Sequence, residues 1–299
     1  MTALLDDRPA RGASAPSDAG APAPAPARPT ARNRRARDLT RRALPPTAAL
    51  LVLLSVWQLA SWASPVRDDL FPGPVDVAAV LPRLIADGTL AAAVGTSLGR
   101  GLSGFLIALV VATPAALLLA HTPWLRRAVG PFISALQVLP SVAWVPAAII
   151  VFGLTDATIY AVILLGAIPS IINGLLAGID LIPAQYRSLS RVLGARRLQH
   201  IALIELPAAL PGYAAGLRQG WAFSWRSLMA AELIAVGGSL GLGVGSLLQR
   251  GRDLADLPLV ILVVLVILAI GAAVELALFA PWERRLLADR GLKRTEDAA

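Results

Sequence analysis

What the chain lacks limits the chemistry it can perform. It contains no cysteine, which excludes disulfides and thiolate chemistry. Its two histidines, His121 and His200, are isolated, and no group of His, Asp and Glu has the spacing of metal ligands. The single lysine, Lys293, follows no glycine-rich loop, so a phosphate-binding P-loop is missing. We therefore expect no catalytic residue, no metal and no bound cofactor in this chain.

Charged residues are also scarce. They make up 15% of the 299 residues, whereas soluble domains contain about a quarter. Hydrophobic residues account for 56%, and the mean hydropathy is +0.67. The net charge of +8 does not indicate nucleic-acid binding, because the arginines lie in short segments between apolar stretches. This composition predicts a multi-pass membrane protein.

Six apolar stretches reach the length of about 20 residues that a helix needs to cross a bilayer. They cover residues 43–63, 98–120, 130–153, 158–182, 212–236 and 257–281. We therefore expect an all-α protein with six transmembrane helices over 44–283, including a polar loop at 183–211. A short amphipathic helix is expected at 75–86, and Pro140 and Pro146 should kink the third span.

The two ends of the chain are polar. Residues 1–43 are rich in Ala, Pro and Arg and are expected to form a disordered tail, with a second tail at 284–299. Of the 27 Lys and Arg residues, 20 lie in the two tails, the second-to-third connection and the 183–211 loop. The positive-inside rule then predicts that both termini and this loop are cytoplasmic, in a protein of the cell membrane.

The polar loop carries a recognisable spacing. Gly194 is followed by nine residues and then by Ile204, Leu206 and Pro207, in the pattern E-A-A, three residues, G, nine residues, I, one residue, L-P. On these residues the chain resembles the membrane subunits of bacterial ABC importers, and most closely the nitrate, taurine and alkanesulfonate permeases. The resemblance covers about residues 70–282. Ser188 occupies the acidic position of the pattern, so the docking contact of that residue does not transfer.

Independently of the resemblance, Gly194 is suited to a left-handed turn between two short helices. Pro207 and Pro211 are expected to end the second of these helices. The alternative is a basic amphipathic helix that lies on anionic lipid.

The resemblance implies a set of partners. The 183–211 loop would dock on a separate ABC ATPase subunit, which uses the ATP, through Arg187, Ser188, Gly194, Ala195, Ile204, Leu206 and Pro207. It further implies a homodimer and an extracytoplasmic solute-binding protein that delivers a small anion, first of all taurine or another aliphatic sulfonate. Nitrate, bicarbonate and thiamine-precursor permeases are alternatives of the same class. An ion-coupled secondary transporter is an alternative of another class, although the spans offer few carboxylates.

The fifth span is unusually polar. A charged side chain at the centre of a transmembrane helix costs about 2.5–3.5 kcal/mol on insertion scales and usually faces a partner or a water-filled path. The fork of an arginine matches a sulfonate, carboxylate or nitrate. Arg226, and with less support Arg218, are therefore candidate residues of the anion path, with Trp225, Trp221 and Trp144 as its walls. The alternatives are helix packing for the tryptophans, and pairing of the arginines with Glu232, Asp180 or backbone carbonyls.

Overall fold

The computed structural model describes residues 48–64, 70–186, 192, 194 and 196–288. The predicted tail at 1–43, residues 289–299 of the predicted tail at 284–299, and the loop residues Arg187, Ser188 and Ala195 lie outside these ranges. Residues 284–288 of the second tail belong to a helix, Ala280–Ala288. The chain divides into two units, Met1–Leu54 and Ser55–Ala299, and the second contains nearly all described residues. Within the described part every regular element is helical, as the sequence predicts for an all-α fold.

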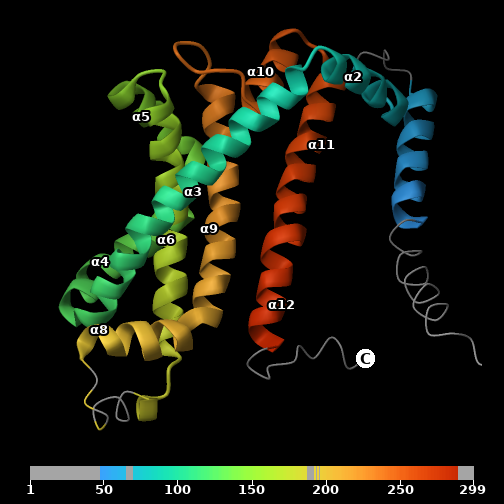
Figure 1. Cartoon of the computed structure of the whole chain (residues 1–299). Coiled ribbons are helices and arrows are strands. Elements are labelled where there is room, and N and C mark those ends of the chain that lie inside the picture. The colour runs from blue at the N-terminus through green and yellow to red at the C-terminus, as the bar shows by residue number, and fades with distance from the viewer. Residues whose placement is uncertain (1–47, 65–69, 187–191, 193, 195, 289–299) are drawn as a thin grey trace, which may run out of the picture. The chain divides into compact units, whose positions relative to one another are not determined.

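The helices of the second unit are labelled in Figure 1. They are α2 (Pro74–Ala86), α3 (Thr89–His121), α4 (Pro123–Val138), α5 (Trp144–Phe152), α6 (Asp156–Asp180), α8 (Arg197–His200), α9 (Leu206–Ile234), α10 (Val244–Asp253), α11 (Leu257–Val274) and α12 (Ala280–Ala288). A 3₁₀ turn, Ser141–Ala143, precedes α5, and π-helical turns at Ile201–Glu205 and Glu275–Phe279 precede α9 and α12.

Three helices of the described part are long and apolar enough to cross a membrane: α3, α6 and the continuous Leu257–Leu286. The bent pair Pro123–Val138 and Ser141–Phe152 raises this number to four if it forms one span. α9 has 29 residues, but its charged and polar side chains lower its hydropathy, and the apolar helix Ala48–Ala63 is shorter. The count of six spans therefore stays a prediction.

The third predicted span is broken rather than kinked. α4 and the helical segment after it meet at 97°, with Leu139 and Pro140 in extended conformation between them. Proline has no N–H to continue the helix and disfavours helical conformation in the residue before it, which explains the break at Pro140. Pro146 causes no kink because it lies in the first turn of α5, where its missing N–H needs no partner.

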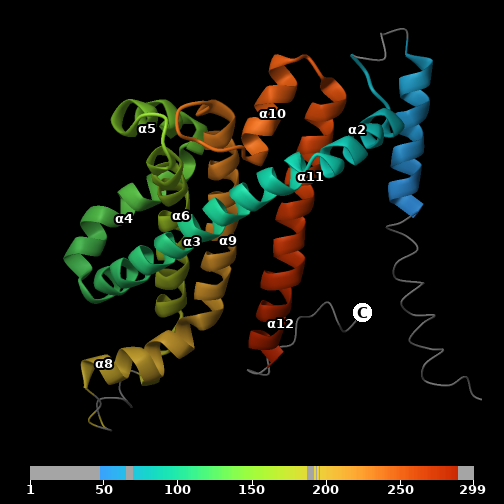
Figure 2. The same cartoon turned by 45° about the horizontal axis from the view of Figure 1, so that its top comes forward.

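The close contact of α6 with α9 forms the centre of the second unit. A Cβ added to Gly174 would lie 2.3 Å from Cα of Gly216, and one added to Gly212 would lie 2.5 Å from Cα of Gly178. Small residues four positions apart let two helix backbones approach in this way. The two helices run side by side in both views (Figures 1 and 2).

Short helices lie at the two ends of α9. α8 lies at one end of α9, and α10 lies at the other (Figure 1). The predicted amphipathic helix at 75–86 is confirmed as α2, whereas α10 was not foreseen. At the corner between α2 and α3, Asp87 Oδ1 accepts a 2.9 Å hydrogen bond from the Thr89 amide. This bond holds the pKa of Asp87 below its ordinary value.

Candidate functional site

A cavity of about 320 Å³ lies at the break in the third predicted span. The break itself contributes Gln137, Ser141 and Trp144, while α9 contributes Phe223 and Arg226. The structure thus brings together two of the predicted path residues, Arg226 and Trp144, around one space. Because the helix stops here, its unpaired backbone groups need partners other than lipid, and irregular backbone at membrane depth is tolerated where it lines a cavity.

Arg226 has no carboxylate within ion-pair distance among the described residues. Its Nε donates to the Ala222 carbonyl at 3.2 Å, and its guanidinium carbon lies 4.5 Å from the centroid of the Phe223 ring. The backbone pairing considered from the sequence is therefore present, but only through Nε. The two carboxylates considered as partners are bound elsewhere, Glu232 by Arg100 and Asp180 by Arg126.

A short series of hydrogen-bonded polar side chains extends from the cavity. Gln137 donates from Nε2 to Ser170 Oγ at 2.9 Å, and Asn173 donates from Nδ2 to Gln137 Oε1 at 3.0 Å. Ser170 and Asn173 lie on α6, which continues from the cavity toward the end of the unit that carries α8. Polar groups inside a membrane protein commonly mark a solute path.

The other predicted path residues lie away from this cavity. Arg218 forms ion pairs with Glu275 and, at 3.1 Å, with Glu283, and neither partner was considered from the sequence. Trp221 and Trp225 are buried and stacked, with ring centroids 6.2 Å apart. Both tryptophans take part in helix contacts.

Those contacts are specific. Trp221 meets the ring of Phe105 in α3 edge-on at 5.7 Å, and Trp225 donates from Nε1 to the Ile267 carbonyl of α11 at 3.3 Å. The tryptophans therefore join α9 to its neighbours, in line with the helix-packing alternative considered for them.

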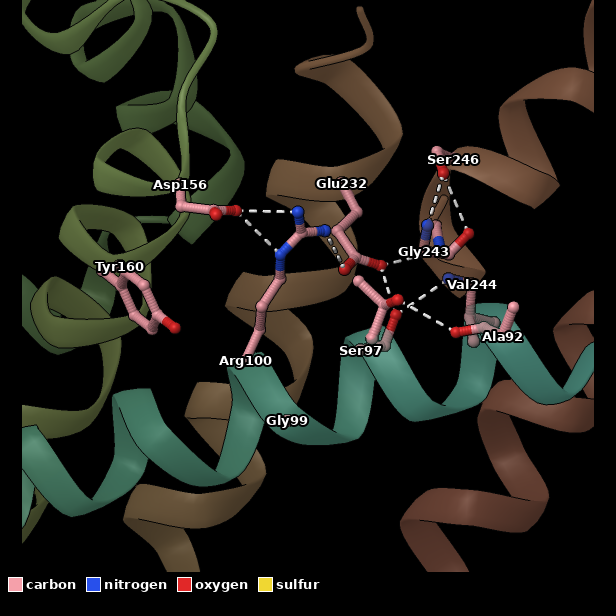
Figure 3. Close-up of polar contacts among 12 residues, drawn as sticks. Ala92, Ser97, Gly99, Arg100, Asp156, Tyr160, Glu232, Gly243, Val244 and Ser246 are labelled. Atoms are coloured by element: carbon pink, nitrogen blue, oxygen red, sulfur yellow. Dashed lines mark hydrogen bonds and ion pairs between the residues drawn. The ribbon is translucent and has the colours of Figure 1, made fainter. Parts of the chain in front are cut away.

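A buried polar cluster that the sequence analysis missed joins α3, α6, α9 and α10 (Figure 3). Glu232, only 1% exposed, accepts from Ser97 Oγ at 2.6 Å, from Arg100 Nη1 at 3.0 Å and from the Gly245 amide at 3.0 Å. The other two nitrogens of the Arg100 guanidinium contact Asp156, with Nη2 2.7 Å and Nε 2.9 Å from Oδ1.

Arg100 was overlooked because the second span was expected to begin near residue 98, which would place the arginine at its edge. The helix in fact begins at Thr89, so Arg100 lies a full three turns inside it. One signal was available in the sequence. Ser97, Arg100, Gly101 and Gly104 recur at helical spacing, which indicates a small and polar face turned toward other helices.

The loop that resembles a coupling segment is partly described. Gly194 has φ = +68°, the left-handed conformation expected for it. The expectation that Pro207 and Pro211 end the preceding helix is wrong: α8 continues through the π-helical turn into α9. Pro207 directly follows the π-helical turn Ile201–Glu205, and the helix continues past it although proline has no N–H to donate. The helix nevertheless changes direction between the α8 label and the upright part of α9 (Figure 1), and both the π-helical turn Ile201–Glu205 and Pro211 inside α9 are features that commonly kink a helix.

Comparison with known proteins assigns the class. Residues 104–280 match the family described as binding-protein-dependent transport system inner membrane component. Among the described residues no group of three or more His, Cys, Asp or Glu could hold a metal ion. The chain belongs to this family, the membrane permeases of ABC transporters, as the sequence resemblance indicates.

Individual relatives indicate the type of ABC transporter permease. The chain is 30% identical to a probable ABC transporter permease of Brucella melitensis, over 72% of this chain and 85% of the relative. It is 30% identical to the nitrate import permease NrtB of Synechococcus elongatus, over 70% and 78% of the two chains. It is 28% identical to the taurine transport permease TauC of Escherichia coli, over 83% and 90%. The protein is therefore an ABC importer permease of the nitrate and taurine type.

Proposed function

We propose that this permease carries a small anion past Arg226, and that the solute is taurine or another aliphatic sulfonate. The observation that carries the proposal is a guanidinium that faces the cavity at the helix break and has no carboxylate partner among the described residues. The guanidinium group of an arginine can bind a sulfonate through two N–H groups. Of the Arg226 nitrogens only Nε makes a hydrogen bond to a described residue, so Nη1 and Nη2 can bind the solute.

The composition of the cavity supports the choice of anion. The relatives are named for nitrate and for taurine, and both solutes carry an anionic group. Trp144, Phe223 and Leu139 line the same cavity of about 320 Å³ as Arg226. An apolar wall beside one cation suits a sulfonate with a short carbon chain better than nitrate, which has no apolar part.

Partners and orientation complete the proposal. Six of the twelve described arginines belong to α4, to α12, or to α8 and the residue before it, at the end that carries α8, which supports a cytoplasmic position for that end: Arg126, Arg127, Arg196, Arg197, Arg284 and Arg285. There an ABC ATPase subunit would dock on the loop containing Gly194, and a solute-binding protein would approach the opposite end. Two copies of this chain would form the transport channel.

Uptake in the host strain with this gene deleted tests the proposal. Labelled taurine, a linear alkanesulfonate and nitrate are supplied in parallel, with and without depletion of ATP. We expect loss of ATP-dependent sulfonate uptake, restored by the intact gene. Loss of nitrate uptake alone would assign the solute to the other named type, and sulfonate uptake that survives ATP depletion would favour an ion-coupled transporter.

A further inference from the structure

The only two histidines of the chain meet at one buried carboxylate. Glu205 ends the π-helical turn that joins α8 to α9, and 4% of the residue is exposed. Its Oε2 atom lies 3.0 Å from Nε2 of His121, the last residue of α3, and 4.0 Å from Nε2 of His200, the last residue of α8. One charge is thus shared by the end of α3, by α8 and by the start of α9.

The protonation of His121 follows from its second contact. Nδ1 lies 2.8 Å from the carbonyl oxygen of Leu117, and because a carbonyl can only accept, Nδ1 carries a proton. A neutral imidazole has one N–H, so a neutral His121 presents a lone pair to Glu205. The contact at Nε2 is attractive only when another proton lies between the ring and the carboxylate.

The carboxylate needs that proton. Glu205 Oε2 accepts no hydrogen bond from any described residue, and His200 Nδ1 is likewise buried without a hydrogen-bond partner in the described part. A buried carboxylate oxygen without a hydrogen bond is costly unless a cation neutralises the group or the group is itself protonated. Among the described residues, the two histidines are the groups placed to supply the charge.

Other charged groups at this end of the unit do not replace them. Arg126 of α4 is bonded to Asp180 of α6, with Nη1 2.8 Å from Oδ1. The remaining arginines of α4 and of the α8 region are exposed: Arg127, Arg196 and Arg197. Within the described residues only the two histidine rings lie within ion-pair distance of Glu205.

We propose that Glu205 is a positioning residue that ties α8 to the end of α3 through a proton shared with His121 and His200. Histidine ordinarily changes charge between about pH 5 and about pH 8. The tie is therefore firm at acid pH and loosens as the pH rises and the shared proton is lost. Its consequence for transport rests on the proposed function, because α8 belongs to the loop on which the ATPase would dock.

The test uses the full chain in lipid nanodiscs. Since the protein has no native cysteine, Leu118→Cys and Leu198→Cys give two unique sites for spin labels, and both leucines are exposed. Pulsed electron paramagnetic resonance then measures the distance between the end of α3 and α8 at about pH 5.5 and about pH 8.5. We expect a distribution at least about twofold broader at the higher pH, since deprotonation removes the tie.

Variants of Glu205 distinguish a role of its shared proton from a role in packing alone. Glu205→Ala removes the tie and should give the broad distribution at both pH values. Glu205→Gln keeps the size of the side chain and removes the charge that needs a proton, so it should give the narrow distribution at both. The matched control, Arg126→Gln, breaks the other ion pair at this end and should leave the pH response intact.

Two results would overturn the proposal: a parent distribution that ignores pH, or a pH response that persists in Glu205→Gln. Neither measurement involves an ATPase or a solute, so both are independent of the proposed function. In the reconstituted importer, Glu205→Ala should lower the solute carried per ATP severalfold, and Glu205→Gln should restore it. Equal values in the two variants would contradict a role of the tie in coupling.

Discussion

Nη1 of Arg100 in α3 lies 3.0 Å from Oε1 of Glu232 in α9, although 132 positions separate the two residues in the chain. The side chain of Arg100 is 8% exposed and that of Glu232 is 1% exposed. The buried Glu232 carboxylate is therefore stabilised by the cation of Arg100, and the pair fixes how α3 and α9 face each other.

Removing one partner should be worse than removing both. Arg100→Gln leaves the buried Glu232 carboxylate without its cation or forces it to become neutral, at a cost of about 3–5 kcal/mol in the free energy of unfolding. Glu232→Gln should cost less, because Arg100 keeps its contact with Asp156. The double variant should recover part of this loss. Thermal unfolding of the purified protein measures the cycle, and strictly additive losses would show that the two charges do not interact.

Close packing of α6 on α9 predicts a second stability effect. Gly174→Ala places a Cβ 2.3 Å from Cα of Gly216, so the two helices must separate, at a cost of about 1–3 kcal/mol. Gly130→Ala is the matched control, because an added Cβ there has no neighbour within 4 Å among the described atoms. Unfolding temperatures should differ between these two variants, and equal values would contradict this view of the helix contact.

Arg226 should matter for transport more than for stability. Arg226→Gln removes the cation of the cavity without leaving a buried carboxylate behind, and we expect uptake to fall at least about tenfold at normal membrane levels, consistent with loss of a charge-assisted bond. Arg226→Lys keeps the charge but loses the fork, so it should be intermediate. Wild-type uptake in the Gln variant would remove Arg226 from the path.

Arg218 should behave differently. It pairs with Glu275 and Glu283, so Arg218→Gln leaves two carboxylates without their cation and should lower the unfolding temperature. The same measurement on Arg226→Gln should show a smaller change. The reverse order would contradict the assignment of Arg218 as a structural residue.

The turn at Gly194 offers a test of partner docking. Its φ of +68° is not accessible to proline, which is held near −65°, so Gly194→Pro must reshape the loop. We expect the ATPase subunit to be lost in co-purification from detergent. Gly194→Ala is strained by the same φ but to a smaller extent, and should retain part of the ATPase. Full co-purification with Gly194→Pro would exclude this turn from the docking surface.

The sequence by itself determined the elements that depend on neighbours along the chain. Apolar runs of helical length predicted α3, α6 and α11, and Pro140 marked the position where the third span breaks. The spacing from Gly194 to Pro207 indicated the family. Hydrophobicity, proline and glycine act within a few residues, and for this reason they can be interpreted without tertiary structure.

Only the tertiary structure decided which charges meet. Arg226 and Arg218 are both arginines of the fifth predicted span. Arg226 nevertheless lines a cavity, whereas Arg218 pairs with Glu275 and Glu283 near the end of the chain. Glu232 finds its partner in Arg100, a residue that local reasoning placed at a helix end. In an environment of low dielectric constant the fate of a charge depends on the groups within a few ångströms of it, and helix packing, not distance along the chain, brings those groups together.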